Sequence, residues 1–153
     1  MATIRSYNQA PDLTAQDQRA PVPAETFNAC VLVVEEHEDT RFMLKTILEL
    51  RGGISVIEAE NGEMAVALAE NVHVDLILID SDLPLLDGYA ATRRIRELTS
   101  TREVPIVFLS GHAQPAAEAK AFAAGCNDYL LKPFALGELG SLLERYLAHA
   151  KAN

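Results

Sequence analysis

Polar or charged side chains follow several aliphatic runs of this sequence at the point where each run ends. The clearest case is the stretch VDLILIDSDLPLLDG, in which an uninterrupted run leads directly into Asp80. The pair Glu35-Glu36, Ser110 and Lys132 stand in the same position after three other runs. If the runs are strands of one parallel sheet, their carboxyl ends share an edge, and these residues converge there.

Residues of these types can together handle a phosphoryl group. Carboxylates crowded in one place repel one another and stay ionised when a divalent cation lies among them, and oxygen ligands suit Mg²⁺. Lys132 supplies a positive charge for an anion, and Ser110 supplies a hydroxyl donor. We therefore predict that Asp80 is a nucleophile that accepts a phosphoryl group beside a magnesium ion.

The pattern of apolar residues predicts five strands that alternate with five helices. Unbroken aliphatic runs are typical of strands buried on both faces of a parallel sheet, whereas spacings of three and four residues indicate amphipathic helices. Such alternation favours an α/β fold with helices on both faces of the sheet. The expected strands are 30–34, 54–59, 74–79, 104–109 and 128–131, and the expected helices are 40–50, 63–70, 88–98, 114–124 and 136–150. Asp87 is placed to cap the third of these helices.

Length and composition indicate one domain. The chain has 153 residues and a formal net charge of −9, which argues against nucleic acid or an anionic membrane as the main partner. No apolar run approaches the ~18 residues of a membrane span, and the first residues lack the apolar core of a signal peptide, so we expect a cytoplasmic protein. The polar, proline-containing residues 1–28 are interpreted as a flexible leader, and 29–150 as the domain. Cys30 and Cys126 are expected to be reduced thiols.

Four pieces of the sequence resemble the receiver domain of two-component response regulators over roughly residues 29–148. They are VLVVEEHEDTR, DSDLPLLDG, IVFLSGHA and GCNDYLLKPF, in the order of the family and each at a predicted strand end. The resemblance implies a flavodoxin-like (βα)5 three-layer sandwich with strand order 2-1-3-4-5. It also implies a single-domain response regulator, which is a signalling protein and not an enzyme.

The resemblance further implies a phosphorylation site. Asp80 corresponds to the phosphoacceptor aspartate, and Glu35 and Glu36 correspond to the acidic pair that holds Mg²⁺. The backbone carbonyl of Asp82 would add a further metal ligand. The implied donor of the phosphoryl group is a phosphohistidine on a histidine kinase or phosphotransfer protein.

Three other residues correspond to the parts that sense the phosphoryl group. Ser110 matches the hydroxyl residue that reaches its oxygens, and Lys132, which precedes Pro133 in what the family usually has as a cis peptide, matches the lysine that pairs with it. Tyr129 matches the aromatic residue that swings inward with Ser110. The switch would be read on the face formed by the fourth helix, the fifth strand and the fifth helix, by an effector protein or a second copy of the chain.

Glu36 departs from the family, which usually has aspartate there. One extra methylene moves the carboxylate by ~1.5 Å, so we expect a weakened or rearranged magnesium site. This departure keeps open a receiver-like adapter that binds partners without phosphorylation. A metal-dependent phosphoryl enzyme is a third interpretation, because Glu35, Asp80 and Asp82 also resemble the Toprim arrangement and Asp80-x-Asp82 resembles the haloacid-dehalogenase motif. His37 and His112 flank the same rim and are expected to be exposed loop side chains.

Overall fold

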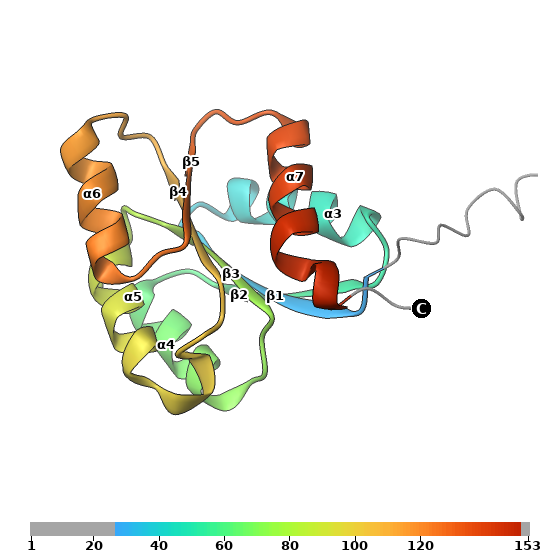
Figure 1. Cartoon of the computed structure of the whole chain (residues 1–153), viewed down its shortest axis with the longest axis horizontal. Coiled ribbons are helices and arrows are strands. Elements are labelled where there is room, and N and C mark those ends of the chain that lie inside the picture. Colours follow the sequence, from blue (N-terminus) through green and yellow to red (C-terminus); the bar gives the residue numbers. More distant parts are fainter. Residues whose placement is uncertain (1–26, 151–153) are drawn as a thin grey trace, which may run out of the picture.

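The computed structural model describes residues 27–150, which form a twisted parallel sheet between two layers of helices (Figure 1). The sheet has five strands in the order β2-β1-β3-β4-β5, and every neighbouring pair is parallel. The predicted α/β fold and strand order are therefore confirmed. The strands are β1 (Ala29–Val34), β2 (Ile54–Ala59), β3 (Leu76–Asp80), β4 (Ile106–Ser110) and β5 (Asp128–Leu131).

Five α-helices connect the strands and cover both faces of the sheet. Helices α3 and α7 pack on one face, and α4, α5 and α6 pack on the other (Figure 1). The helices are α3 (Glu38–Leu50), α4 (Gly62–Asn71), α5 (Gly88–Glu97), α6 (Pro115–Ala124) and α7 (Leu136–Leu147), with short 3-10 turns at Thr99–Thr101 and Ala148–Ala150.

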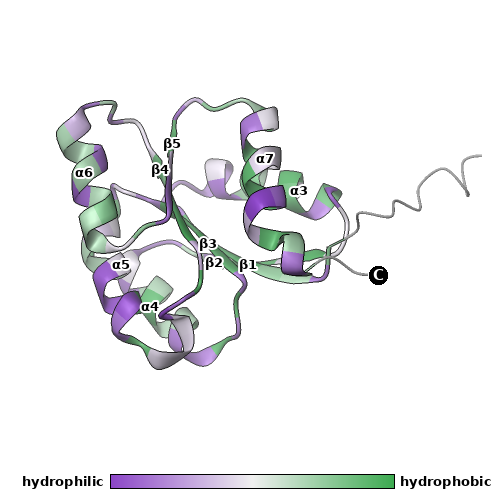
Figure 2. Ribbon diagram, viewed as in Figure 1, coloured by the Kyte–Doolittle hydropathy of each residue, from purple (hydrophilic) through white to green (hydrophobic). Residues whose placement is uncertain are grey.

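The middle strands are buried on both faces, which explains their unbroken aliphatic sequences. Alternate residues of β1 enter opposite layers: Leu32 and Val34 pack toward α4, α5 and α6, whereas Val31 and Val33 pack toward α3 and α7. All five residues of β3 and of β4 are buried. Hydrophobic colour accordingly follows the central strands, and hydrophilic colour gathers on the outer sides of the helices (Figure 2).

The ends of several elements differ from the prediction. Strand β3 begins two residues later than expected, and both β3 and β4 extend by one residue, so that they include Asp80 and Ser110. The cause is the parallel register, which pairs Asp80 with Leu109 and Ser110 with Leu131. These two residues are therefore held by the sheet itself rather than by the loops after it.

The folded domain also begins earlier than residue 29. Phe27, which was assigned to the leader, is only 2% exposed, and its backbone N–H donates to Gly52 O at 3.1 Å. The backbone N–H of Asn28 donates to Ala150 O at 2.6 Å. The rest of the proposed leader, residues 1–26, lies outside the described residues.

Two further predictions concern cysteines and membrane spans. Cys30 and Cys126 are free, as predicted, and Cys126 is buried. Burial raises the pKa of the Cys126 thiol to about 11, so it stays protonated near neutral pH. Among residues 27–150, no helix is both long enough and apolar enough to cross a membrane.

Helix α5 begins directly against the end of β3. The carboxylate of Asp87 accepts a hydrogen bond from the Ala90 N–H at 2.8 Å, which confirms the predicted cap. The Gly88 N–H donates to Ser81 O at 3.1 Å. A Cβ on Gly88 would lie 2.4 Å from Asp80 O and 2.9 Å from Ser81 Cα, so only glycine fits without moving the backbone of Asp80.

Replacing Gly88 by alanine is expected to lower the free energy of unfolding by about 1–3 kcal/mol, because the added methyl group overlaps rigid backbone. Urea denaturation measures the change. Gly137→Ala is the matched control, since nothing lies within 4 Å of a Cβ there and the residue is in helix α7. The control should be neutral or slightly stabilising. Equal stability of Gly88→Ala and the wild type would refute the constraint.

Candidate functional site

The structure brings Glu35, Asp80 and Lys132 together at the carboxyl edge of the sheet, as predicted. The Lys132 Nζ lies 3.1 Å from Glu35 Oε1 and 3.4 Å from Asp80 Oδ1. Lys132 directly follows β5, and the peptide bond between it and Pro133 is cis. One ammonium group therefore bridges two carboxylates that come from the ends of β1 and β3.

Glu35 is fully buried, and both of its carboxylate oxygens are engaged. While Oε1 faces Lys132, Oε2 accepts the His37 backbone N–H at 3.0 Å and lies 3.1 Å from His37 Nδ1. Burial would raise the pKa of Glu35, but the hydrogen bonds from His37 and the charge of Lys132 outweigh it and hold this pKa below its ordinary value. Glu35 is thus a permanent buried anion. His37 has an exposed side chain, as predicted, yet it also braces this anion.

Asp80 is 5% exposed and has the opposite shift. Burial raises its pKa, and the negative charge of Glu35 raises it further, while Lys132 and the Asp82 N–H, 3.3 Å from Asp80 Oδ1, oppose both effects. Its second oxygen, Oδ2, accepts no hydrogen bond from residues 27–150. The ionised form of Asp80 would therefore be stabilised by a further positive charge nearby. Its Oδ2 has no hydrogen-bond donor among residues 27–150.

Ser110 lies at the same edge but makes no hydrogen bond to Asp80 in the described part of the chain. It is fully buried, and its Oγ accepts from the Ser81 hydroxyl and from the His112 backbone N–H, each at 3.1 Å. The Tyr129 hydroxyl donates to His112 O at 2.8 Å. The Tyr129 ring stacks on Phe108, with centroids 6.4 Å apart. Ser110 and Tyr129 are consequently both attached to the backbone of His112.

The predicted acidic cluster is only partly assembled. Glu36 has an exposed side chain that makes no hydrogen bond or ion pair with residues 27–150, so the structure does not bring it to Asp80. The Asp82 carboxylate is 71% exposed and lies 2.9 Å from His112 Nε2. Within residues 27–150, no group of three or more His, Cys, Asp or Glu side chains is arranged to hold a metal ion.

The oxygen donors that are present nevertheless suit Mg²⁺ in type. Glu35 and Asp80 are close enough for the charge of one to raise the pKa of the other, and a divalent cation between Asp80 and the acidic residues after β1 would relieve this repulsion. Because Glu36 is exposed at the end of a loop, its side chain is free to turn toward such an ion. The donor chemistry therefore fits Mg²⁺, whereas Glu36 as a ligand stays a prediction.

Sequence reasoning missed Ser81. This residue directly follows Asp80, is 1% exposed and contacts Ser110 through its hydroxyl group. Its burial was not evident, because it follows the last residue of the strand and precedes a polar loop. His112 has an exposed loop side chain, as predicted, and it also connects the loops after β3 and β4 through its pair with Asp82.

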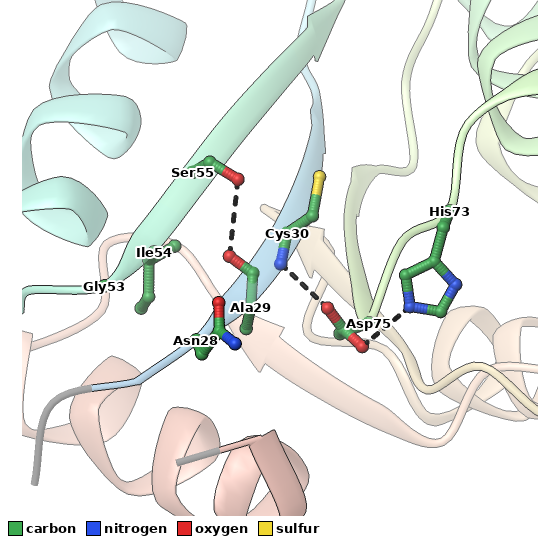
Figure 3. Close-up of a pocket in the computed structure, with 8 residues that line it drawn as sticks. All are labelled: Asn28, Ala29, Cys30, Gly53, Ile54, Ser55, His73 and Asp75. Atoms are coloured by element: carbon green, nitrogen blue, oxygen red, sulfur yellow. Dashed lines mark hydrogen bonds and ion pairs between the residues drawn. The ribbon is translucent and has the colours of Figure 1, made fainter. Parts of the chain in front are cut away.

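A separate pocket of about 600 Å³ lies at the opposite, amino-terminal edge of the sheet (Figure 3). There the Asp75 carboxylate accepts the Cys30 N–H at 2.8 Å and lies 3.1 Å from His73 Nε2, while the Ser55 hydroxyl donates to Ala29 O at 3.4 Å. These polar groups satisfy one another and hold the strand ends together. None of the residues predicted to handle a phosphoryl group lines this pocket.

Replacing Asp80 by asparagine is expected to raise the free energy of unfolding at pH 7 without divalent cations, by on the order of 1 kcal/mol. The substitution removes a buried charge that faces Glu35. Because folding raises the pKa of Asp80, the folded wild type binds this proton more readily than the unfolded chain does, and its stability falls as pH rises through the folded pKa. The advantage of Asp80→Asn should therefore be full at neutral pH and shrink on acidification.

Urea denaturation at several pH values measures this difference. Glu60→Gln removes an exposed carboxylate by the same chemistry and should leave stability nearly unchanged at every pH. A loss of stability in Asp80→Asn at pH 7 would show that Lys132 overcompensates the repulsion.

Known proteins are similar to this chain in sequence. The model of the response regulator receiver domain matches residues 31–144. Two-component response regulator ORR41 of rice is 39% identical over 119 residues, which cover 76% of this chain and 92% of that protein. The transcriptional regulatory protein ResD of Bacillus subtilis is 36% identical over 115 residues, and there the match spans 75% of this chain but only 46% of the relative.

Solved structures agree with the sequence relatives. The receiver domain of the sensor histidine kinase PA1611 from Pseudomonas aeruginosa, which has a magnesium ion in its active-site cleft, superposes with a TM-score of 0.74 at 37% identity, over 79% of this chain and 98% of that one. The chemotaxis protein CheY4 of Vibrio cholerae gives a TM-score of 0.73 at 28% identity, over 78% and 98% of the two chains. The adapter and enzyme interpretations are not favoured by these matches. The chain belongs to the receiver domains of two-component response regulators, a family of signal-transducing domains.

Proposed function

We propose that Asp80 accepts a phosphoryl group from a phosphohistidine of a histidine kinase or phosphotransfer protein. The observation that carries this proposal is the pairing of a buried Asp80, whose Oδ2 accepts no hydrogen bond from the described residues, with a lysine 3.4 Å from its other oxygen. Receiver domains as a family obtain their phosphoryl groups from such proteins. One relative over 118 residues, at 36% identity, is part of the hybrid signal transduction histidine kinase G of Dictyostelium discoideum.

The transfer is a displacement at phosphorus. A carboxylate oxygen of Asp80 forms the new O–P bond while the P–N bond of phosphohistidine breaks, and the imidazole leaves with the electron pair and takes up a proton. The product is an acyl phosphate, whose ~1.5–2 negative charges replace the single charge of the Asp80 carboxylate in a site that already holds Glu35. Lys132 lies where it can pair with this charge, because its ammonium already faces both carboxylates.

Magnesium is the cofactor we propose for this site, held by Glu36, Asp80 and the backbone carbonyl of Asp82, with Glu35 beside them. When bound, the ion would offset the negative charge shared by the carboxylates and the incoming phosphoryl oxygens. Glu36, which is exposed, must reach the ion with a side chain one methylene longer than aspartate. We infer that magnesium binds more weakly here than it would with aspartate at this position.

The output of the switch would be the face formed by α6, β5 and α7. Ser110 and Tyr129 lie behind this face and are joined through His112, so a shift of Ser110 toward a phosphoryl oxygen would release or redirect the Tyr129 ring. Three large apolar side chains are exposed there: Phe122 (45%), Leu131 (42%) and Leu136 (64%). An effector protein or a second copy of this chain would bind this surface.

Incubation of the protein with acetyl phosphate and Mg²⁺ is expected to add the mass of one phosphoryl group, located on Asp80 by peptide mapping. The label should be released by hydroxylamine, as for an acyl phosphate. Asp80→Asn should remain unmodified, and the exposed control Glu60→Gln should be modified like the wild type. Modification of Asp80→Asn at an equal rate would contradict the assignment.

Replacing Glu36 by aspartate is expected to tighten Mg²⁺ binding by about tenfold, because the shorter carboxylate matches the short bonds that Mg²⁺ requires. Calorimetry or NMR titration with Mg²⁺ measures the affinity. Glu38→Asp, at the start of the same loop-helix junction and equally exposed, is the matched control and should leave it unchanged. Equal affinities of the wild type and Glu36→Asp would exclude Glu36 as a ligand.

A further inference from the structure

A second buried hydroxyl group lies beside the proposed switch residue. Ser81 Oγ donates to Ser110 Oγ at 3.1 Å, and the two residues are 1% and 0% exposed. They belong to neighbouring strand ends, one directly after β3 and the other at the end of β4. Water has little access to this contact, so the hydrogen bond between them has no ready solvent replacement.

This contact completes the accepting capacity of the Ser110 hydroxyl. A serine oxygen has two lone pairs, and here one accepts from Ser81 Oγ and the other from the His112 N–H, also at 3.1 Å. Ser110 makes no hydrogen bond to Asp80 in the described part of the chain. Both contacts use lone pairs of Ser110 Oγ, so its O–H is still available as a donor. A movement of Ser110 Oγ toward a phosphoryl oxygen on Asp80 would lengthen the hydrogen bond from Ser81.

The backbone of Ser81 is held from both sides. Its backbone N–H donates to Leu109 O at 3.3 Å, and its carbonyl oxygen accepts from the Gly88 N–H at 3.1 Å. Gly88 packs closely against the Ser81 backbone: a Cβ atom added to Gly88 would lie 2.9 Å from Ser81 Cα. The backbone from which Ser81 Oγ projects is therefore fixed by the end of β3 and by the start of α5.

The position of Ser110 is connected to the position of Tyr129 through the backbone of His112. His112 donates its backbone N–H to Ser110, and its carbonyl oxygen accepts a hydrogen bond from the Tyr129 hydroxyl at 2.8 Å. The Nε2 atom of the His112 ring lies 2.9 Å from Asp82 Oδ2. A chain of hydrogen bonds thus runs from Ser81 through Ser110 and His112 to Tyr129. Ser110 is the one member of this chain that is proposed to touch the phosphoryl group, and Ser81 is its neighbour on the side of β3.

We propose that Ser81 is a positioning residue that holds the Ser110 hydroxyl in its resting place, and that the Ser81–Ser110 hydrogen bond opposes activation. This inference rests on the proposed phosphoryl-acceptor function of Asp80. Loss of the bond removes part of the free energy that favours the resting arrangement, so a larger fraction of the protein is competent to bind a phosphoryl group or its mimic.

Ser81→Ala tests the proposal with beryllium fluoride, a phosphoryl mimic, at a fixed Mg²⁺ concentration. The variant is expected to bind the mimic about two- to tenfold more tightly than the wild type, which corresponds to the net contribution of one hydrogen bond. Without the mimic, the His112 amide resonance of Ser81→Ala should already be shifted toward its position in the bound wild type. Affinity for Mg²⁺ alone should not change.

Two variants separate this effect from a general response to a lost hydroxyl group. Thr92→Val removes a fully buried hydroxyl of α5 that has no hydrogen-bond partner among residues 27–150, and it should leave mimic affinity and the His112 resonance unchanged. Ser81→Cys keeps the size of the side chain with a weak S–H donor, and it should show a smaller gain than alanine. It also serves as the test if Ser81→Ala does not fold.

A double-mutant cycle with Ser110→Ala completes the test. In a Ser110→Ala background, Ser81→Ala should have no further effect on mimic affinity, because the Ser110 hydroxyl that Ser81 contacts has been removed. Unchanged or weaker mimic binding in both Ser81 variants, with the wild type binding normally, would overturn the inference and leave the proposed function intact. A wild type that neither binds the mimic nor is phosphorylated on Asp80 would instead overturn the proposed function.

Discussion

The ammonium group of Lys132 between the carboxylates of Glu35 and Asp80 is the interaction on which the site depends. It joins the ends of β1, β3 and β5, and it places one positive charge among two negative ones in a buried setting. Removal of one partner of a buried ion pair is usually costly, because the remaining charge has no solvent. Here the imbalance falls on Asp80, whose pKa is raised, and not on Glu35, which His37 also stabilises. Glu35 and Lys132 thus form the permanent pair, and Asp80 is the group whose state can change.

The frame around this triad leaves Asp80 little freedom. Register with Leu109 fixes its backbone within the sheet, and Gly88 brings the start of α5 against its carbonyl group. On the far side, Ser81, Ser110, His112 and Tyr129 form a continuous set of hydrogen bonds. The ionic groups Glu35 and Lys132 and the hydrogen-bonded set that includes Ser110 therefore both lie near Asp80. Within residues 27–150, Ser110 and Asp80 make no direct hydrogen bond. In the proposed function, a phosphoryl group on Asp80 would lie within reach of both Lys132 and Ser110, so it could alter the contacts of both residues.

The fold was largely predictable, because strands that are buried on both faces of a sheet have unbroken aliphatic sequences. Every predicted strand and helix is present among residues 27–150, and the errors lie at their ends. Strand register set those ends, and register depends on neighbouring strands that no local pattern reveals. The burial of Phe27 was likewise not predictable from its neighbours in sequence, which are polar. It results from contacts with the segment after α3 and with the layer formed by α3 and α7.

The sequence by itself determined which residues gather at the functional edge, because an aliphatic run ending in a polar residue places that residue at the carboxyl end of a strand. Asp80, Glu35, Lys132 and Ser110 all met that rule. Only the tertiary structure decided which of two adjacent glutamates is buried: Glu35 lies against Lys132 and His37, whereas Glu36 is exposed. It alone also revealed the contact between Ser81 and Ser110. Both outcomes depend on side-chain direction at a strand end and on partners from distant segments, neither of which local sequence encodes.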